Sequence, residues 1–434
     1  MPQTAARSRS SAPGAEPTGF LGRPGSTFAI AAVIAVAAVG VRFSLLHEQS
    51  TDYVVFLKPW SQHIATHGGF RALKDTGFSD YNAPYLYFMA LLTYLPISAL
   101  AGIKALSVGF DLLLAFFAFR ITALRHPGRP ALPLAAGGVV LFLPTVTANS
   151  GWWGQADSIF TAFIVGGIYF VLRHRPWWAC TFFGLALAFK LQTVFIFPFL
   201  FVLLLVRRLP LKALLAFPAV FLALDVPALL IGADPVKLLT IYARQTGTYQ
   251  HLTMNAPSVY QFVTAGQHDE AIRSAGILGT GLVLLVLTAL VVFSRVGRTA
   301  MRFGGRDSEI TSTHIVLMAA VSATLVPFLL PSMHERYFFV ADVLSVIAAF
   351  HLPKRLWPLP VLVQISSFGS YMQYITDQEL NAKPNMGIYA GLMAVAVIYL
   401  VVVTILEFRR TDKSAGPGAP EPATVSTRPR IPVA

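Results

Sequence analysis

The sequence has little cysteine and little charge. Cys180 is the single cysteine in 434 residues, so a disulfide framework and a cysteine-based metal site are both excluded, and we expect this side chain to serve packing. Charged residues make up 12% of the chain and hydrophobic residues 55%, whereas soluble domains carry about a quarter charged residues. Water is therefore not the main solvent of this chain, and we expect a protein embedded in the lipid bilayer.

Acidic residues are also scarce, with 20 against 33 basic ones and a formal net charge of +13. Such a charge would suit a nucleic-acid-binding protein, but the basic residues stand in short clusters between apolar runs and do not line one face. We interpret the clusters as topology signals and expect no nucleic-acid partner.

The apolar residues form stretches that approach or reach the roughly 17 to 22 residues needed to cross the hydrocarbon core. We therefore expect an all-α, polytopic transmembrane helix bundle of about twelve spans, with interfacial helices in the first outer loop. The expected spans are 28–46, 102–121, 131–148, 157–172, 176–189, 191–206, 211–232, 275–294, 312–330, 337–351, 356–373 and 387–407.

Both ends of the chain are polar. Residues 1–27 are rich in Ser, Pro, Gly and Arg, and residues 408–434 carry almost no periodic apolar pattern, so we expect two disordered cytoplasmic tails around a membrane domain at 28–407. The first apolar run is long and lacks a small-residue cleavage site, which predicts a retained signal anchor.

Basic clusters set the orientation, because short cytoplasmic loops retain Lys and Arg. With twelve spans every cluster falls on one side, which predicts a multi-pass protein of the cell membrane with both termini in the cytoplasm. This requires that 85–101, which is also apolar, lies at the interface and does not cross. Pro84 and Pro96 bracket that stretch, and its tyrosines suit the headgroup level.

This topology gathers the unusual polar residues on the non-cytoplasmic face, where we expect the active site. The outer segments are a long loop at 47–101 containing a surface helix at 53–66, the GWWGQAD segment (151–157), the turn at Lys190, a loop at 233–272, the HERY turn and 374–386.

Asp52 directly follows the first expected span, at the membrane surface. A carboxylate there could act as a general base that takes a proton from an acceptor hydroxyl. It could also be the N-cap of the helix at 53–66, because aspartate is a preferred cap residue. The two roles are compatible.

The GWWGQAD segment places Trp153, Gln155 and Asp157 between apolar helices. An aromatic platform with hydrogen-bonding groups suits a sugar ring. The alternative is an interfacial tryptophan belt with a capping aspartate, and the pattern alone does not decide between them.

Two lysines interrupt apolar segments. Lys190 is costly there unless it snorkels or binds an anion such as a phosphate, and both explanations stay open. Lys104 and Asp111 are seven residues apart and share roughly one face of a helix. A structural ion pair with another helix is the favoured explanation of Asp111.

His334, Glu335 and Arg336 form a polar island between two expected spans. Arg336 could grip a phosphate with paired donors, and Glu335 could orient it or bond sugar hydroxyls. A metal site is a weaker alternative, because the sequence lacks H-x-x-x-H and H-E-x-x-H.

The order of these motifs resembles the GT-C superfamily of polyprenyl-phosphate-sugar-dependent glycosyltransferases. An outer-loop aspartate (Asp52), a relaxed D-Y-x-x-P element (Asp80, Tyr81, Pro84), Lys104 with Asp111, FKLQ (189–192) and MHERY (333–337) are similar to the N-glycan glucosyltransferases. W-G-Q-x-D with a later H-E-R-Y is similar to bacterial mannosyltransferase-like relatives of the PIG-V GPI mannosyltransferase.

The resemblance implies a GT-C type bundle and a mannosyltransferase that uses a polyprenyl-phosphate-linked sugar donor, with inversion. We expect no cofactor and assign no metal ligand. Its acceptor would be a glycolipid, polysaccharide or protein. Asp52 would be the catalytic base. The donor phosphate would be bound by Lys190, Arg336, His334 and Lys104, and the sugar or acceptor by Trp153, Gln155, Asp157, Glu335, Tyr81 and Gln192.

A transporter or flippase of polar lipids is the main alternative class, since intramembrane charges and many spans fit it as well. The two halves of the sequence show no internal repeat, which many transporters have, and the polar residues gather at one boundary. A scaffold without activity would leave the HERY island unexplained.

Overall fold

The computed structural model describes residues 24–246, 251–264, 266, 268–303, 310–375 and 385–414. Most of the two expected disordered tails lies outside the described residues. Where the ends are described they are helical, because the first helix begins at Pro24 and the last one continues to Ser414.

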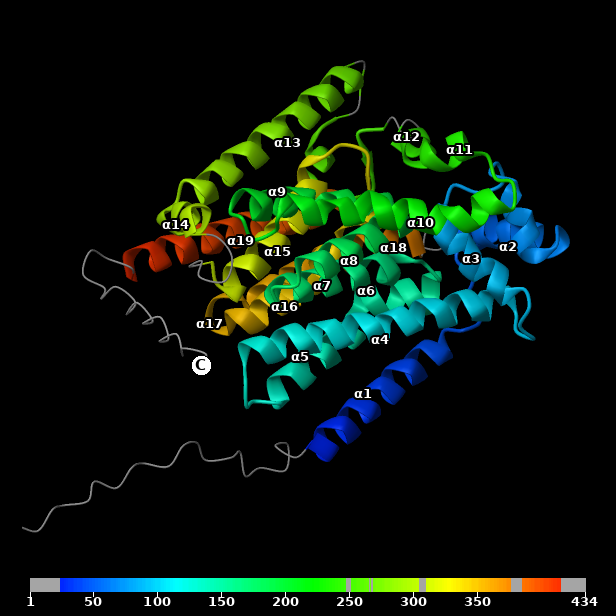
Figure 1. Cartoon of the computed structure of the whole chain (residues 1–434), viewed down its shortest axis with the longest axis horizontal. Coiled ribbons are helices and arrows are strands. Elements are labelled where there is room, and N and C mark those ends of the chain that lie inside the picture. Colours follow the sequence, from blue (N-terminus) through cyan, green and yellow to red (C-terminus); the bar gives the residue numbers. More distant parts are fainter. Residues whose placement is uncertain are drawn as a thin grey trace, which may run out of the picture.

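The described chain is a bundle of helices (Figure 1). The helices of the first half are α1 (Pro24–Ser44), α2 (Lys58–Thr66), α3 (Ala83–Leu92), α4 (Ala99–Arg125), α5 (Ala131–Phe142), α6 (Pro144–Thr147), α7 (Asp157–Leu172), α8 (Pro176–Phe189) and α9 (Phe197–Leu205). Those of the second half are α10 (Ala216–Leu230), α11 (Pro235–Leu239), α12 (Ile241–Thr246), α13 (Asp269–Val292), α14 (Arg295–Phe303), α15 (Ser312–Leu329), α16 (Phe339–His351), α17 (Pro353–Leu356), α18 (Pro358–Ile375) and α19 (Met386–Ser414).

Short helical turns and two strands connect these helices. The π-helical turns are η2 (Tyr53–Leu57) and η4 (Ala148–Trp153). The 3-10 turns are η3 (Gly69–Lys74), η5 (Leu191–Ile196), η6 (Leu211–Leu215), η7 (Val259–Phe262) and η9 (Glu335–Phe338). Strands β1 (Thr253–Met254) and β2 (Met333–His334) pair in parallel.

All twelve expected spans fall on helical segments, which confirms an all-α membrane bundle. In the described ranges six helices are long and apolar enough to cross a bilayer, or seven if the bent pair α5 and α6 with η4 is one span. The six are Gly25–Ser44, Ala99–Arg125, Leu211–Leu230, Asp269–Val292, Ser312–Leu329 and Met386–Asp412. Shorter apolar helices, among them α7, α8 and α9, complete the bundle.

The expected interfacial stretch at 85–101 is not one long helix. It contains most of α3, then a turn, and then the start of α4 at Ala99. The ten residues of α3 extend about 15 Å, half of a hydrocarbon core of about 30 Å. This helix alone is therefore shorter than the hydrocarbon core, and the interfacial placement of 85–101 stays a prediction.

Helix α7 is the centre of the core and packs against α4 and α8. Gly166 lets these helices approach closely, because a Cβ atom there would lie 2.5 Å from the Phe182 ring of α8. Helices α15, α16, α18 and α19 pack together beside this group. In contrast, only 11% of the most apolar window of α13 is buried, and this helix stands apart from the bundle in Figure 1.

The basic segments and the long loops lie at opposite ends of the bundle. In Figure 1, α14, α17 and the end of α19 are at the left, whereas α2, α3, α11 and α12 are at the right. These three basic segments therefore lie away from the polar loops, and the orientation of the bundle in the membrane stays a prediction.

Candidate functional site

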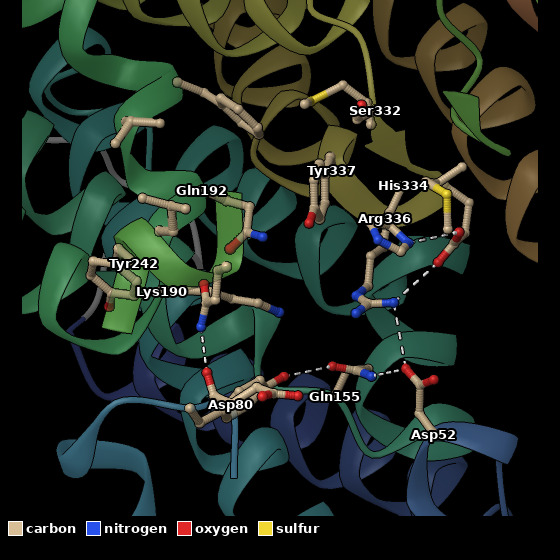
Figure 2. A pocket seen from close by; sticks show the side chains of 18 of the residues that line it. Asp52, Asp80, Gln155, Lys190, Gln192, Tyr242, Ser332, His334, Arg336 and Tyr337 are labelled. Atoms are coloured by element: carbon tan, nitrogen blue, oxygen red, sulfur yellow. Dashed lines mark hydrogen bonds and ion pairs between the residues drawn. The ribbon is translucent and has the colours of Figure 1, made fainter. Parts of the chain in front are cut away.

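A cavity of about 760 Å³ opens at the loop end of the bundle (Figure 2). Eight of the eleven predicted site residues line it, although they come from segments far apart in the sequence. These eight are Asp52, Tyr81, Gln155, Lys190, Gln192, His334, Glu335 and Arg336. Trp153 and Asp157 lie directly behind the wall and contact residues that line it.

Asp52 is buried at the inner end of the cavity and accepts three hydrogen bonds. Trp153 Nε1 donates to its Oδ2 at 3.1 Å, and Gln155 Nε2 donates to the same oxygen. The Tyr374 hydroxyl donates to Oδ1 at 2.8 Å. The predicted N-cap role is wrong, because Asp52 makes no side-chain capping bond, and Ser50 Oγ instead accepts from the backbone N–H of Tyr53.

The GWWGQAD segment reaches the cavity through an irregular backbone. Helices α5 and α6 are separated by a bend of 52° at the Leu143–Pro144 step, where proline removes a helical hydrogen bond. The chain then continues as the π-helical turn η4. This turn ends at Gly154, whose φ of 73° lies in the left-handed region that favours glycine. This geometry leaves Trp153 fully buried, so the interfacial-belt alternative does not apply to it.

Lys190 enters the cavity because α8 ends one residue before it. Its backbone is extended, with φ −154° and ψ 135°, between α8 and η5. The ammonium forms an ion pair with Asp157 Oδ1, and Asp157 Oδ2 accepts from Asn149 at 2.7 Å. A buried lysine in an ion pair does not snorkel, so that alternative is excluded.

The HERY turn is held by main-chain pairing with a distant loop. Thr253 and Met254 of β1 pair in parallel with Met333 and His334 of β2. Glu335 and Arg336 follow directly in η9, where Glu335 is buried and Arg336 faces the cavity.

Arg336 lies among three carboxylates. Its Nη1 is 3.1 Å from Glu335 Oε1 and 3.4 Å from Asp52 Oδ2, and its Nε is 3.9 Å from Asp157 Oδ2. Burial opposes its charge, but these carboxylates, led by Asp52, outweigh burial and raise the pKa of Arg336 above its ordinary value. The buried Nε–H has no hydrogen-bond partner in the part of the chain that the structure describes.

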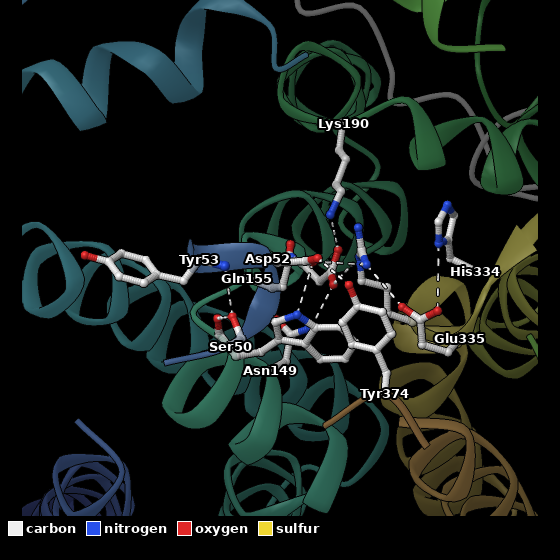
Figure 3. A network of polar contacts seen from close by, with 12 residues as sticks. Ser50, Asp52, Tyr53, Asn149, Gln155, Lys190, His334, Glu335 and Tyr374 are labelled. Atoms are coloured by element: carbon white, nitrogen blue, oxygen red, sulfur yellow. Dashed lines mark hydrogen bonds and ion pairs between the residues drawn. The ribbon is translucent and has the colours of Figure 1, made fainter. Parts of the chain in front are cut away.

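Tyr81 and Gln192 belong to the cavity wall as predicted. The Tyr81 hydroxyl donates to Gln155 Oε1 at 3.3 Å, which orients the amide so that its NH₂ group faces Asp52. His334 Nδ1 is 3.8 Å from Glu335 Oε2 (Figure 3). A chain of polar contacts thus connects most of the predicted residues.

Lys104 is the exception, and the prediction that it binds the donor phosphate is wrong. Its ammonium donates to the carbonyl oxygens of Leu45 at 2.6 Å and Glu48 at 2.7 Å, and it does not line the cavity. It therefore binds the backbone of the turn that follows α1. Asp111 has the expected structural ion pair, with Arg42 Nε of α1 at 2.7 Å from its Oδ2.

Sequence reasoning missed Tyr374, in the last turn of α18. Its ring stacks on Trp153 with centroids 5.0 Å apart, and its hydroxyl contacts Asp52. The sequence offered one signal: two tyrosines three residues apart, Tyr371 and Tyr374, end a helix that is otherwise mostly apolar. The expected span ended at 373 and excluded the second of them.

No metal site accompanies these groups among the described residues, where no cluster of three or more His, Cys, Asp and Glu side chains could hold an ion. Two cations, Lys190 and Arg336, form ion pairs with the carboxylates of the site.

The fold and the site define a multi-pass membrane protein with a buried acid–base cluster in a cavity at one end of the bundle. Residues 78–319, more than half of the chain, match the model of glycosyltransferase family 87, and the chain belongs to this family. A search of curated proteins found no match. Family membership confirms the predicted membrane glycosyltransferase and speaks against a transporter or scaffold.

The matched region holds only part of the site. It carries Tyr81, Gln155 and Lys190, whereas Asp52, Arg336 and Tyr374 lie outside it. Asp52 accepts from Trp153 and Gln155, and Arg336 Nε is 3.9 Å from Asp157 Oδ2, so the cavity is built jointly by matched and unmatched segments.

Proposed function

We propose that this enzyme transfers a mannosyl residue from a polyprenyl-phosphate-linked donor to an acceptor hydroxyl on the non-cytoplasmic face, with inversion. Asp52 is the catalytic base. One observation carries the proposal: in a chain of a glycosyltransferase family, Asp52 lines the same cavity as Lys190 and Arg336.

In the proposed step Asp52 receives the proton of the acceptor hydroxyl. The hydroxyl oxygen attacks the anomeric carbon, the bond from that carbon to the phosphate oxygen breaks, and polyprenyl phosphate leaves with the electron pair. A single in-line displacement of this kind inverts the anomeric centre. Because three neighbours donate to Asp52, its carboxyl group acts as an acceptor, which is the form that a base requires.

The donor phosphate is the proposed partner of Arg336. The unpartnered Nε–H is a donor that a phosphate oxygen would satisfy, and an unpaired buried donor costs about 1 to 3 kcal/mol. The contact of Arg336 with Asp52, at 3.4 Å, is longer than a good charge-assisted bond. Arg336 would exchange this contact with Asp52 Oδ2 for a contact with the phosphate.

Lys190 would supply the second positive charge. In the structure Lys190 pairs with Asp157, and Arg336 pairs with Asp52 and Glu335, so both cations would change partners to bind a phosphate. Both cations then face the phosphate as its charge grows in the transition state, where fixed charges stabilise it most.

An apolar groove beside the cavity supports a lipid-linked donor. It has a volume of about 520 Å³ and lies between α9, α13, α15 and α19. Phe195 lines the cavity and Phe199, one helical turn further, lines the groove. On α13, Ile277 lines the cavity and Leu284, two turns further, lines the groove. A polyprenyl chain would extend from the phosphate along these helices.

Mannose as the transferred sugar follows from the similarity of the W-G-Q-x-D and H-E-R-Y elements to mannosyltransferases. The acceptor is proposed as a glycolipid, a polysaccharide or a protein. The wall residues Tyr81, Gln155 and Gln192 supply hydroxyl and amide groups that suit sugar hydroxyls.

The test uses the purified full-length protein in lipid nanodiscs with radiolabelled polyprenyl-phosphate mannose, glucose and arabinose, each with a membrane lipid extract as acceptor. We expect the mannosyl donor to be consumed and polyprenyl phosphate to be released. Consumption of another donor refutes the mannosyl assignment. Movement of intact donor across a liposome membrane without cleavage contradicts the transferase step.

A further inference from the structure

Tyr374 contacts the oxygen of Asp52 that Trp153 and Gln155 do not contact. Its hydroxyl donates to Asp52 Oδ1 at 2.8 Å, and its ring stacks on the Trp153 indole at an interplanar angle of 18° (Figure 3). The indole in turn donates to Asp52 Oδ2 at 3.1 Å. Tyr374 therefore contacts the carboxylate directly and also supports another of its donors.

The two oxygens of Asp52 are held differently. Oδ2 accepts from Trp153 and Gln155 and faces Arg336. Oδ1 accepts from the Tyr374 hydroxyl, which is the one hydrogen-bond donor to this oxygen among the described residues. Rotation of the carboxyl group is thus fixed at one oxygen by the GWWGQAD segment and at the other by α18.

We propose that Tyr374 is a positioning residue that holds Oδ1 of Asp52 toward the cavity, where the acceptor hydroxyl delivers its proton. The inference rests on the proposed role of Asp52 as the base. It adds α18, which lies beyond the region matched to the family, to the machinery of the reaction.

The same helix provides a matched control. Tyr371, one turn earlier, also packs on Trp153, edge to face, with centroids 5.3 Å apart. Its ring is fully buried, but its hydroxyl has no hydrogen-bond partner in the described part of the chain. Replacing either tyrosine by phenylalanine keeps the ring on Trp153, and only Tyr374→Phe removes a bond to Asp52.

The pH dependence of activity distinguishes a positioning role of Tyr374 from a packing role. A hydrogen bond to an ionised carboxylate favours the ionised form, so its loss lets the base take up a proton at higher pH. The other charged and titratable groups around Asp52 are the same in both variants. They are Arg336 and Glu335 of η9, Asp157 of α7, Lys190 beside it, and Tyr81.

The experiment measures consumption of polyprenyl-phosphate mannose by wild-type, Tyr374→Phe, Tyr371→Phe and Asp52→Asn protein in nanodiscs between pH 4 and 8. For Tyr374→Phe we expect kcat/KM to fall about tenfold at acidic pH, and the acidic limb to move up by about one pH unit. The KM for the donor should change little. Tyr371→Phe should follow the wild-type profile.

Two results would overturn the inference. In one, Tyr374→Phe and Tyr371→Phe lose activity equally without a movement of the acidic limb, which assigns both to packing. In the other, Tyr374→Phe is indistinguishable from wild type while Asp52→Asn is inactive, which removes the positioning role and leaves the base. Full activity of Asp52→Asn would refute the proposed base and the inference together.

Discussion

Replacing Arg336 by alanine is expected to weaken donor binding and to slow transfer by a larger factor. In the free enzyme Arg336 makes a 3.1 Å contact with Glu335 and a 3.4 Å contact with Asp52, and its Nε–H is unpartnered within the described residues. A phosphate would gain two charge-assisted bonds of about 1.5 to 3 kcal/mol each. Release from Asp52 offsets part of this gain.

The net loss on truncation is therefore about 1.5 to 3 kcal/mol, which corresponds to a donor Kd about 10-fold to 150-fold higher. Charge on the phosphate grows as the bond breaks, so kcat should fall by a further factor of about 100. Arg336→Lys keeps the charge but loses the planar fork, and we expect an intermediate effect.

The assay is equilibrium binding of labelled polyprenyl-phosphate mannose in nanodiscs, followed by turnover of the same preparation. Arg355→Ala is the control, because Arg355 pairs with Glu407 at 3.0 Å at the other end of the bundle. Thermal stability of each variant reports loss of folding. Donor affinity and kcat that stay at wild-type values in a folded Arg336→Ala protein would refute the reasoning.

Three further predictions concern the base, the first helix and the topology. Asp52→Asn should abolish transfer while donor affinity changes less than tenfold; rapid transfer would remove Asp52 from the mechanism. Arg42→Leu should lower the free energy of unfolding by about 3 to 5 kcal/mol, seen as a lower Tm, because Asp111 stays buried without its cation. Adding Asp111→Leu should recover part of this loss; stability losses that simply add would contradict an ion pair. In a Cys180→Ala background, Thr264→Cys should label from outside intact cells and Arg302→Cys only after permeabilisation; the reverse would invert the topology.

The membrane bundle was predictable because its signal is one of composition and length. Twelve apolar stretches became helices, since a chain in lipid must satisfy its backbone polar groups within each segment. The breaks were harder to predict. The π-helical turn before Gly154 and the extended residue at Lys190 depend on neighbouring helices, and yet these breaks aim Trp153 and Lys190 at the site.

Most of the candidate site was predictable because polar residues in an apolar chain are few. The direction of each long side chain was not. Lys104 lies on α4, but its ammonium binds backbone carbonyls of the turn after α1 and does not line the cavity. The partners within the cluster were also unknown from sequence: Gln155 and Trp153, expected to bind sugar, donate to Asp52 in the structure.

The pairing of β1 with β2 holds the backbone of the cavity wall in place whichever side chains the two strands carry. Backbone atoms join the two segments, and further contacts come from Ser332, whose N–H donates to the Leu252 carbonyl at 2.9 Å and whose Oγ donates to the His251 carbonyl at 2.8 Å. Backbone pairing does not depend on the side chain, so Met254, which lines the cavity, can be exchanged without moving the arginine two residues beyond β2. Met254 is therefore a position where substitution would change the cavity wall while backbone pairing keeps Arg336 in place, and we expect mutagenesis there to alter the preference for the proposed acceptor.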